Sequence, residues 1–229
     1  MTPKVIAIDG HSSTGKSSLS KKVASALGFI HVDTGAMYRA IAWYTLDKKM
    51  LSSEGELLVD KIVNSLDDIN LKFELNPNSG NREIHLNGQN IEGEIRSMEV
   101  ANLVSTVAKI PEIREHLVKL QRQMANEVGI VMDGRDIGSV VFPDAPVKIF
   151  LTASAKVRAQ RRYDELRSNG VEISFDEVEE NINSRDAIDT QRSASPLVKA
   201  EDAIEVKNDH MNQEETLQTV LKIIKEKGI

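Results

Sequence analysis

The segment that most constrains this chain lies near its start, where Gly10 to Ser17 matches the pattern G-x-x-x-x-G-K-S/T at every fixed position. The apolar, β-branched run Val5–Ile8 precedes it and predicts a strand buried on both faces of a parallel sheet. Apolar residues then recur at helical spacing as far as Leu27, and Gly28 stands where a helix would end. A strand, a glycine-containing loop and a helix in this order predict an α/β fold whose first turn binds polyphosphate.

The residues of this loop have separate expected roles. Its two glycines let the backbone curl, so that successive amide groups point inward and form an anion-binding concavity. Lys16 can reach the terminal phosphates of a nucleoside triphosphate, and the Ser17 hydroxyl can bind the accompanying Mg²⁺. The residues expected to contact the triphosphate are Gly10, His11, Ser12, Ser13, Thr14, Gly15, Lys16, Ser17 and Ser18.

Composition excludes several other kinds of protein. The 229 residues suit one α/β domain with insertions, and the net charge of −6 argues against a general nucleic-acid-binding surface. The absence of cysteine excludes disulfides, thiolate zinc sites and a cysteine nucleophile. The chain starts almost directly with its first strand, and no apolar run approaches the roughly 18 residues of a membrane span. We therefore expect a cytoplasmic protein without nucleic-acid or membrane partners.

Histidines do not indicate a metal centre. The five histidines have neither a second histidine nor an acidic residue at a spacing that recurs in zinc enzymes. We expect them to be surface or packing residues. They are His11, His31, His85, His116 and His210.

A second predicted core strand, Phe29–Val32, leads into a polar cluster. The sequence continues Asp33-Thr-Gly-Ala-Met-Tyr-Arg39, and Asp33 or Thr34 can cap a helix that follows. Ligands bind at the carboxyl edge of the strands in open α/β sheets. The side chains from Asp33 to Arg39 are therefore candidates for ligand contact.

An inserted antiparallel sheet is predicted between the core strands. Apolar and polar residues alternate over Ile69–Leu75, and residues 76–80 favour a turn. The apolar segment Ile84–Leu86 is followed by Asn87-Gly88, a dipeptide that favours a type I′ turn. This pattern interrupts the alternation of strands and helices, so it indicates an insertion. A helical stretch, Leu57–Leu66, precedes the sheet.

Two helices are predicted next, over Ile95–Ala108 and Pro111–Val128. Arg114 and Arg122 fall on or near one face of the second helix, and from the residues alone this face is expected to be solvated.

The parallel core resumes with the apolar strand Ile130–Met132, which ends at Asp133. An acidic residue at the carboxyl end of a strand suits a metal or a metal-bound water, and a simple turn cap is the alternative. Together with the phosphate-binding loop, the position favours the metal role. A further core strand is predicted over Val147–Thr152.

A charged helical pair follows this strand. The first helix runs from about Lys156 toward Gly170, and the second begins with the capping box Ser174–Glu177 and runs toward Arg192. Such a pair is ordinarily a solvated hairpin, but after a phosphate-binding loop we favour a lid whose arginines meet the triphosphate. A last strand is predicted over Ala203–Val206 and a last helix over Glu214–Lys225.

Arginines are numerous for a protein of acidic balance, and guanidinium groups bind phosphate bidentately. One phosphate-binding loop serves one nucleotide, so a second group of arginines suggests a second phosphorylated ligand and phosphoryl transfer between the two. A phosphate monoester is largely dianionic at neutral pH and needs no general base to act as a nucleophile. The arginines concerned are Arg39, Arg114, Arg135, Arg185 and Arg192.

Several motifs follow one another along the chain, namely Gly10–Ser17, Asp33–Arg39, Gly93–Arg96, Glu99–Ala101, Asp133–Gly138, and Arg185-Asp186 with Asp189 and Arg192. Together and in this order they resemble bacterial cytidylate kinases. Thr34 and Ser139 stand where relatives may carry Ser and Thr, and both exchanges keep a hydroxyl.

This resemblance implies a P-loop nucleoside monophosphate kinase fold with a five-stranded parallel sheet flanked by helices. Residues 1–229 would form one kinase domain, with a monophosphate-binding subdomain over 36–110, an antiparallel β insertion over about 65–95 and a short helical lid over 155–190. The implied reaction is in-line transfer from ATP, with Mg²⁺, to CMP or dCMP, which gives ADP and CDP or dCDP.

The resemblance also implies roles for individual residues. Ser105, Arg114 and Asp136 would contact cytosine, Asp189 with Arg185 the sugar, and Arg39, Arg135 and Arg192 the phosphate. The remaining implied CMP contacts are Thr34 and Tyr38, and the lid would contact ATP through Arg158, Arg161 and Arg162. The implied catalytic residues are Lys16, Arg135, Arg161 and Arg192. The implied metal-binding residues are Ser17 and Asp133.

Alternative functions remain open at this stage. A kinase for another monophosphate, or for a small alcohol such as shikimate, would use the same loop. A GTP-binding switch would require the guanine-reading motif Asn-Lys-x-Asp, which the sequence does not contain. A nucleotide-binding regulator would bind ATP without turnover. We expect a monomer of 25.4 kDa, since no apolar stripe indicates an interface.

Overall fold

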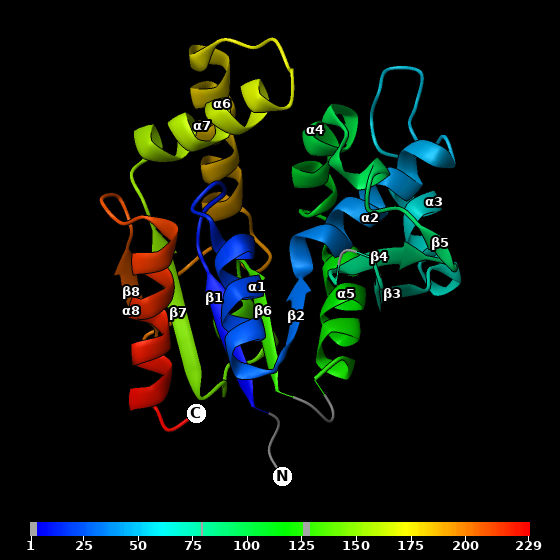
Figure 1. Cartoon of the computed structure of the whole chain (residues 1–229). Helices are drawn as coiled ribbons and strands as arrows, with labels where there is room; N and C mark the ends of the chain where they lie inside the picture. The colour runs from blue at the N-terminus through cyan, green and yellow to red at the C-terminus, as the bar shows by residue number, and fades with distance from the viewer. Residues whose placement is uncertain (1–3, 79, 126–128) are drawn as a thin grey trace. The chain divides into compact units, whose positions relative to one another are not determined.

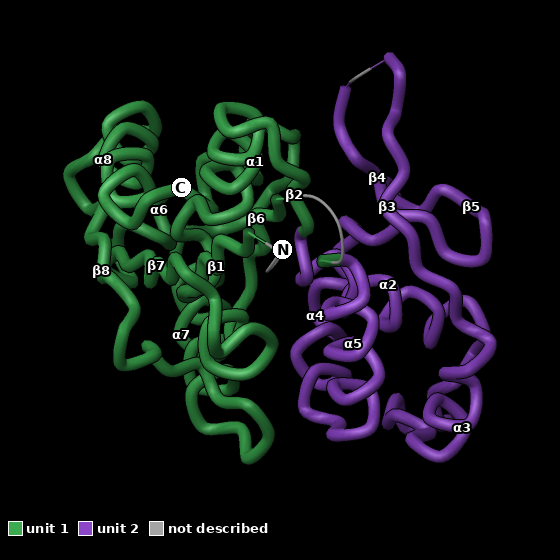
Figure 2. The backbone as a smooth tube through the Cα atoms, turned by 90° about the horizontal axis from the view of Figure 1, so that it is seen from below, with its two compact units in different colours: residues 1–32, 125–229 green, residues 33–124 purple. Residues whose placement is uncertain are grey.

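The computed structural model describes residues 4–78, 80–125 and 129–229. These residues form two compact units, one from Met1–Val32 with Ala125–Ile229 and one from Asp33–Met124 (Figure 2). The expected start at the first residues, the turn residue Ser79 and the end of the helix predicted to reach Val128 lie outside the described residues.

A five-stranded sheet in the order β2-β6-β1-β7-β8 forms the centre of the first unit (Figure 1). Strand β1 pairs in parallel with β6 and with β7, and β7 pairs in parallel with β8. Because β1 is flanked by β6 and β7 and is buried along its length, the segment that follows it starts from the middle of the sheet edge. The strands are β1 Val5–Asp9, β2 Ile30–Asp33, β6 Ile130–Gly134, β7 Val147–Thr152 and β8 Ile204–Lys207.

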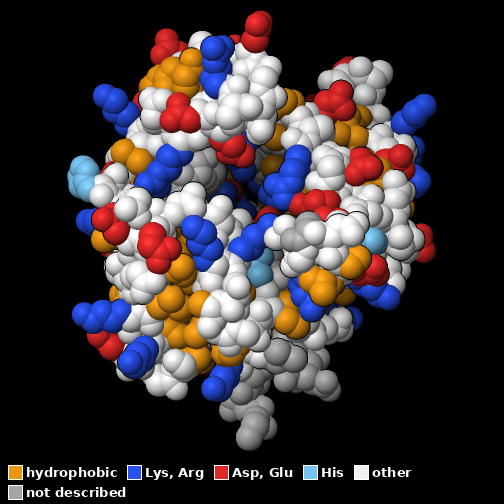
Figure 3. Space-filling view, in the orientation of Figure 1, with side chains coloured by type: hydrophobic (Ala, Val, Ile, Leu, Met, Phe, Trp, Pro, Cys, Tyr) orange, Lys and Arg blue, Asp and Glu red, His pale blue; other side chains and the backbone are white. Residues whose placement is uncertain are grey.

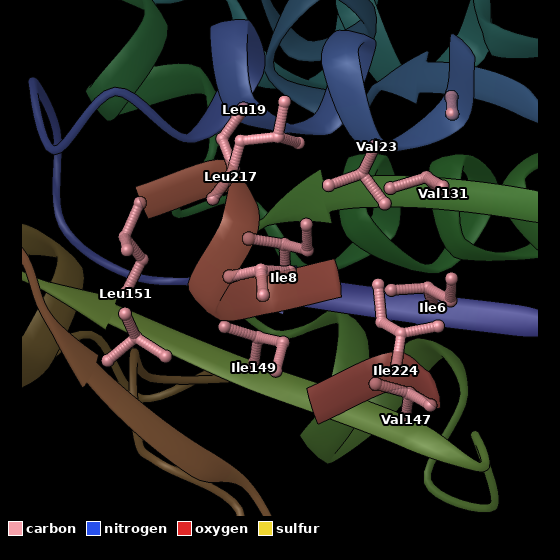
Figure 4. Packing of buried hydrophobic residues seen from close by; sticks show 13 residues of the cluster. Ile6, Ile8, Leu19, Val23, Val131, Val147, Ile149, Leu151, Leu217 and Ile224 are labelled. Carbon is pink, nitrogen blue, oxygen red and sulfur yellow. The ribbon is translucent and has the colours of Figure 1, made fainter. Parts of the chain in front are cut away.

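Helices α1 (Lys16–Leu27) and α8 (Gln213–Glu226) supply apolar side chains to the core of this unit. Figure 4 shows Leu19 and Val23 of α1 and Leu217 and Ile224 of α8 packed with side chains of the sheet. Burial of β-branched and leucine side chains against a parallel sheet is the main stabilising contribution expected in such a layer. This packing fixes α1, and with it the loop at its start.

A second apolar cluster joins α6 (Ala155–Ser168) to α7 (Phe175–Gln191). The expected capping box at the start of α7 is confirmed, because Ser174 and Glu177 each bond the other residue's backbone amide. Four buried residues form this cluster, so the helical pair has a small core of its own. They are Ala159, Leu166, Val178 and Ile182.

The second unit combines helices with a small antiparallel sheet in the order β3-β4-β5. The expected turn is confirmed: Asn87 and Gly88 have φ of 50° and 83°, both positive as a type I′ turn requires, and they join β4 to β5. The elements of this unit are α2 Thr34–Asp47, α3 Val59–Asn64, η1 Leu66–Asp68, β3 Leu71–Leu75, β4 Arg82–Leu86, β5 Gln89–Asn90, η2 Glu94–Arg96, α4 Met98–Val107 and α5 Pro111–Gln123.

Two predicted elements differ from the structure. The expected helix Ile95–Ala108 is divided, because the Ser97 side chain accepts a hydrogen bond from the Val100 amide and caps a new helix at Met98. The segment after β6 was not predicted as helical, but Ile137–Val141 forms one turn of π-helix (η3). Such turns are rare and frequently occur at functional sites.

Candidate active site

The phosphate-binding loop joins β1 to α1 through two glycines in unusual conformations. Gly10 has a φ of 149°, and a Cβ there would lie 2.1 Å from the carbonyl oxygen of Leu151, so only glycine fits. Gly15 has a φ of 87° and forms the N-cap of α1. The loop residues from Gly10 to Ser18 therefore lie where the sequence predicts, at the positive end of a core helix.

Lys16 is buried at the start of α1, and its ammonium group turns back onto the loop. Its Nζ donates hydrogen bonds to the carbonyl oxygen of His11 and, at 3.4 Å, to Oγ1 of Thr14. Burial, with a contribution from the positive charge of Arg135, lowers the pKa of Lys16 to about 7. A bound anion would reverse this effect by favouring the charged form.

Ser17 contacts Asp133, the acidic residue at the end of β6. The Ser17 hydroxyl donates to Oδ2 of Asp133 over 2.7 Å, and Nε2 of His31 lies 2.6 Å from Oδ1 of the same carboxylate. Both expected metal-binding residues are thus adjacent. His31 was expected to be a surface or packing residue, and this interpretation omitted its contact with Asp133.

The donor set at this point consists of a hydroxyl and a carboxylate, which suit a hard divalent cation that keeps several waters. Among the described residues, no group of three or more His, Cys, Asp or Glu side chains could enclose a metal by itself. Ser17 and Asp133 therefore fit a cation that arrives with a polyphosphate.

Two arginines of α6 reach the phosphate-binding loop. Arg158 donates to the Ser12 carbonyl oxygen at 3.4 Å and forms an ion pair with Asp186 of α7. Arg161 donates to the Thr14 carbonyl oxygen at 3.4 Å. The third arginine expected there, Arg162, forms an ion pair with Glu165 over 3.0 Å.

Beside the loop lies a cavity of about 320 Å³. Asn208 bridges its walls, because its Nδ2 donates to the Thr14 carbonyl at 3.0 Å and its oxygens accept from Arg161. The cavity is lined in part by Leu19 and Met211, which offer apolar contact to a ring system. Asn208 and Met211, which follow β8, were not predicted from the sequence because they belong to no nucleotide-binding motif.

A cationic group lies after β6 and on α7. Arg135 Nε donates to Oδ2 of Asp189 over 2.7 Å, and Arg192 Nη1 lies 3.8 Å from Oδ1 of Asp189. Burial alone would raise the pKa of the Asp189 carboxyl, but Arg135, Arg192 and Arg185 together hold it below its ordinary range. Although burial opposes it, Asp189 also raises the pKa of Arg135. These four expected residues are therefore brought together.

Asp9, at the end of β1, holds the neighbouring turn. Its carboxylate accepts hydrogen bonds from the amides of Ile137 (2.8 Å) and Gly138 (2.7 Å), directly after the expected residue Asp136, which is buried. Burial raises the pKa of Asp9 to about 7 despite these bonds. Asp9 was missed because a strand-terminal aspartate ahead of the loop gives no pattern that distinguishes this contact.

The remaining expected residues belong to the second unit. Arg114 is only 3% exposed, which corrects its interpretation as part of a solvated face. Its guanidinium lies 5.2 Å from the ring centre of Tyr38 and donates to the Ala108 carbonyl oxygen at 3.1 Å. Arg39 pairs with Asp33 over 2.9 Å. Thr34 is buried at the start of α2, and Ser105 is half-buried on α4.

The family model described as cytidylate kinase matches residues 6–226 of the chain. The chain belongs to the cytidylate kinase family. It is 53% identical over 219 residues to a cytidylate kinase of Flavobacterium psychrophilum, with 96% of each chain covered. It is 49% identical over 219 residues to a cytidylate kinase of Flavobacterium johnsoniae, with 96% of this chain and 95% of the relative covered. The expected family is confirmed.

The arrangement of the chain also recurs in solved structures outside close cytidylate kinase relatives. A Thermus thermophilus protein gives a TM-score of 0.50 at 14% identity, with 100% of both chains covered. An uncharacterized protein of Eubacterium ventriosum gives 0.50 at 12% identity, with 96% of this chain and 98% of that chain covered. These likenesses concern the fold alone, and the expected α/β fold class is confirmed.

Two further features of this cytidylate kinase family member concern its surface charge and its helices. On the face drawn in Figure 3, basic and acidic side chains are interspersed, in keeping with the net charge of −6. In the part of the chain that the structure describes, no helix has the length and apolar character needed to cross a membrane.

Proposed function

We propose that this chain transfers the γ-phosphoryl group of ATP to CMP or dCMP and releases ADP with CDP or dCDP. One observation carries the proposal: the first unit holds a phosphate-binding loop together with a second set of charged groups, formed by Arg135, Asp189 and Arg192. A protein that only bound ATP would need the loop alone. Family membership supports cytidylate as the second nucleotide.

ATP would bind with its phosphates in the Gly10–Ser18 loop and its base in the cavity beside Asn208. The cavity volume of about 320 Å³ suits a purine ring system. Arg161 lines this cavity and also contacts the loop backbone, which supports a role in binding both the base and the phosphates. Arg158 and Arg162 would add positive charge on the same helix.

Mg²⁺ would enter with ATP and be held by Ser17 and, directly or through water, by Asp133. When bound, Mg²⁺ supplies neutralisation of the charge that develops on the phosphate oxygens. Ser17 and Asp133 serve to place it, and Lys16 adds a fixed positive charge on the same phosphates.

CMP would be bound through its base, its sugar and its phosphate. Asp136 and Ser105 suit the exocyclic amine of cytosine, which donates where uracil has a carbonyl oxygen. Arg114, held against Tyr38, would contact the same base. Asp189 with Arg185 would bind the sugar, and Arg39, Arg135 and Arg192 the phosphate, with Thr34 and Tyr38 completing the contacts.

The reaction then needs positioning and charge stabilisation and no general base. The CMP phosphate is largely dianionic at neutral pH, so its oxygen attacks the γ-phosphorus in line while the bond to the ADP oxygen breaks. Lys16, Arg135, Arg161 and Arg192 stabilise the charge on the transferred group. Removing water protects ATP from hydrolysis, and we propose that residues 155–190 close for this purpose.

We also propose that residues 36–110 form the monophosphate-binding subdomain of a single kinase domain, and that the protein is a monomer. Sedimentation at twice 25.4 kDa would contradict the monomer.

The experiment for the substrate is ADP formation from ATP and Mg²⁺ with a panel of CMP, dCMP, UMP, AMP, dTMP and shikimate. We expect ADP chiefly with CMP and dCMP. A UMP in the same place would set its carbonyl oxygen against a carboxylate and leave both unsatisfied. A higher rate with another monophosphate would contradict the roles of Ser105, Arg114 and Asp136, and ATP binding without turnover would indicate a regulator.

A further inference from the structure

The carboxylate of Asp133 is held from two sides. Oδ2 accepts the Ser17 hydroxyl over 2.7 Å, and Oδ1 lies 2.6 Å from Nε2 of His31. The side chains of His31 and Asp133 are 12% and 3% exposed. A carboxylate bound through both oxygens cannot rotate without losing one of these contacts, so its orientation toward Ser17 depends on His31.

The sheet explains how His31 reaches this position. β2 lies next to β6 in the sheet order, so a residue of β2 can meet a side chain at the end of β6. Because an ionised carboxylate only accepts hydrogen bonds, Nε2 of His31 carries the proton in this contact. Partners behind a metal-binding carboxylate fix its orientation and tune its affinity for the ion.

We propose that His31 is a positioning residue for the divalent cation bound with ATP. It holds the Asp133 carboxylate with Oδ2 toward Ser17, and thereby sets how strongly the site takes the cation. This inference rests on the proposed function, since it assumes that Ser17 and Asp133 receive the cation of ATP. In this role His31 acts through the Asp133 carboxylate, with its Nε2 2.6 Å from Oδ1.

The test measures ATP binding by calorimetry, once with excess Mg²⁺ and once with EDTA, and without any phosphoryl acceptor. The quantity compared between variants is the Mg²⁺ gain, defined as the ATP affinity with Mg²⁺ divided by the ATP affinity with EDTA. H31F keeps an aromatic ring but removes the donor, and we expect this gain to fall roughly 10-fold or more. The affinity in EDTA should change less than twofold. H31Q retains an N–H donor near the position of Nε2 and should restore most of the gain.

His85 offers a matched control in the other unit, since its Nδ1 lies 3.7 Å from a Glu74 oxygen on the small sheet. H85F removes a histidine–carboxylate pair of the same kind and should leave the Mg²⁺ gain unchanged. In a D133A background, H31F should have no further effect on that gain, because His31 acts through Asp133.

Two results would overturn the proposal. One is an unchanged Mg²⁺ gain in H31F, which includes an equal loss of affinity with Mg²⁺ and with EDTA, and the other is full additivity of H31F and D133A. If H31F does not fold, the cation dependence of H31Q against wild type decides the matter, since a lost gain with the donor retained contradicts the role. Failure of the proposed function gives a different result, namely Mg²⁺-dependent ATP binding by the wild type without transfer to CMP.

Discussion

Arg135 and Asp189 form a direct hydrogen bond of 2.7 Å between Nε and Oδ2, which ties the turn after β6 to α7. Nε of the guanidinium is thereby hydrogen-bonded to the protein itself, so the orientation of Arg135 is fixed before any ligand binds. Preorganised charge of this kind stabilises a transition state without reorganisation during the reaction.

Lysine in place of Arg135 keeps the charge but loses the planar fork, which contacts Asp189 and in the proposed reaction would bind a phosphate at the same time. We expect R135K to lower kcat roughly 10²-fold, the magnitude found when one transition-state donor is removed. The KM for ATP should change less than twofold. Steady-state kinetics with CMP varied and ATP varied separate these effects, and the exposed R167K on α6 serves as the control. Wild-type kcat in R135K would remove Arg135 from catalysis.

ATP binding should take up protons at pH 8. The pKa of Lys16 is lowered to about 7 by burial and by Arg135, so at pH 8 most of the free protein has neutral Lys16. The triphosphate favours the charged form, so binding draws a proton from solution; below pH 6 Lys16 is already charged and uptake should vanish. Calorimetry in two buffers of different ionisation enthalpy measures this. We expect K16M to lose the proton uptake and the control K21M to keep it. Proton uptake that persists in K16M would mean that another group binds the proton.

The stability of the wild type should depend on pH through Asp9. Burial raises its pKa from 3.8 to about 7, so the folded state holds the proton more tightly than the unfolded state. Its contribution is complete below about pH 4 and is lost as pH rises to about 7, with a slope of up to about 1.4 kcal/mol per pH unit. Denaturant unfolding at several pH values measures the free energy of unfolding of the wild type and of D9N. The difference between the two should fall as the pH rises. A flat difference between pH 4 and 7 would contradict the raised pKa of Asp9.

Arg161 and Arg162 are neighbours with different surroundings, and they make a matched pair. Arg161 contacts Thr14 and Asn208 at the cavity, whereas Arg162 pairs with Glu165 on the same helix. We expect R161A to raise the KM for ATP roughly 10-fold, about the contribution of one charge-assisted hydrogen bond. R162A should stay within twofold. The reverse order would mean that α6 meets ATP through a different face.

Local rules made much of the fold predictable from sequence. Gly10 is required by its φ and its approach to Leu151, and the Asn87-Gly88 turn follows from two positive φ angles. The division of the helix at Ser97 was harder to predict, because the apolar spacing runs through it and the cap decides the boundary. The π-helical turn over Ile137–Val141 depends on Asp9, which lies far away in sequence.

The candidate site was predictable where a motif states its chemistry and unpredictable where a contact depends on tertiary placement. Lys16 and Ser17 follow from the loop pattern alone. His31 and Asn208 carry no motif, and their contacts with Asp133 and Thr14 appear only when the sheet order brings β2 beside β6 and β8 beside β7. Arg114 was assigned to a solvated face because helical spacing cannot reveal that Tyr38 packs against it.

The most direct test of the central claim follows the γ-phosphoryl group itself. Purified protein is incubated with Mg²⁺, ATP labelled in its γ-phosphate, and an equimolar mixture of CMP and UMP, and the nucleotide products are separated. The account predicts label in CDP, matched mole for mole by ADP, with far less label in UDP. Label released chiefly as inorganic phosphate, or found in UDP as readily as in CDP, would contradict it.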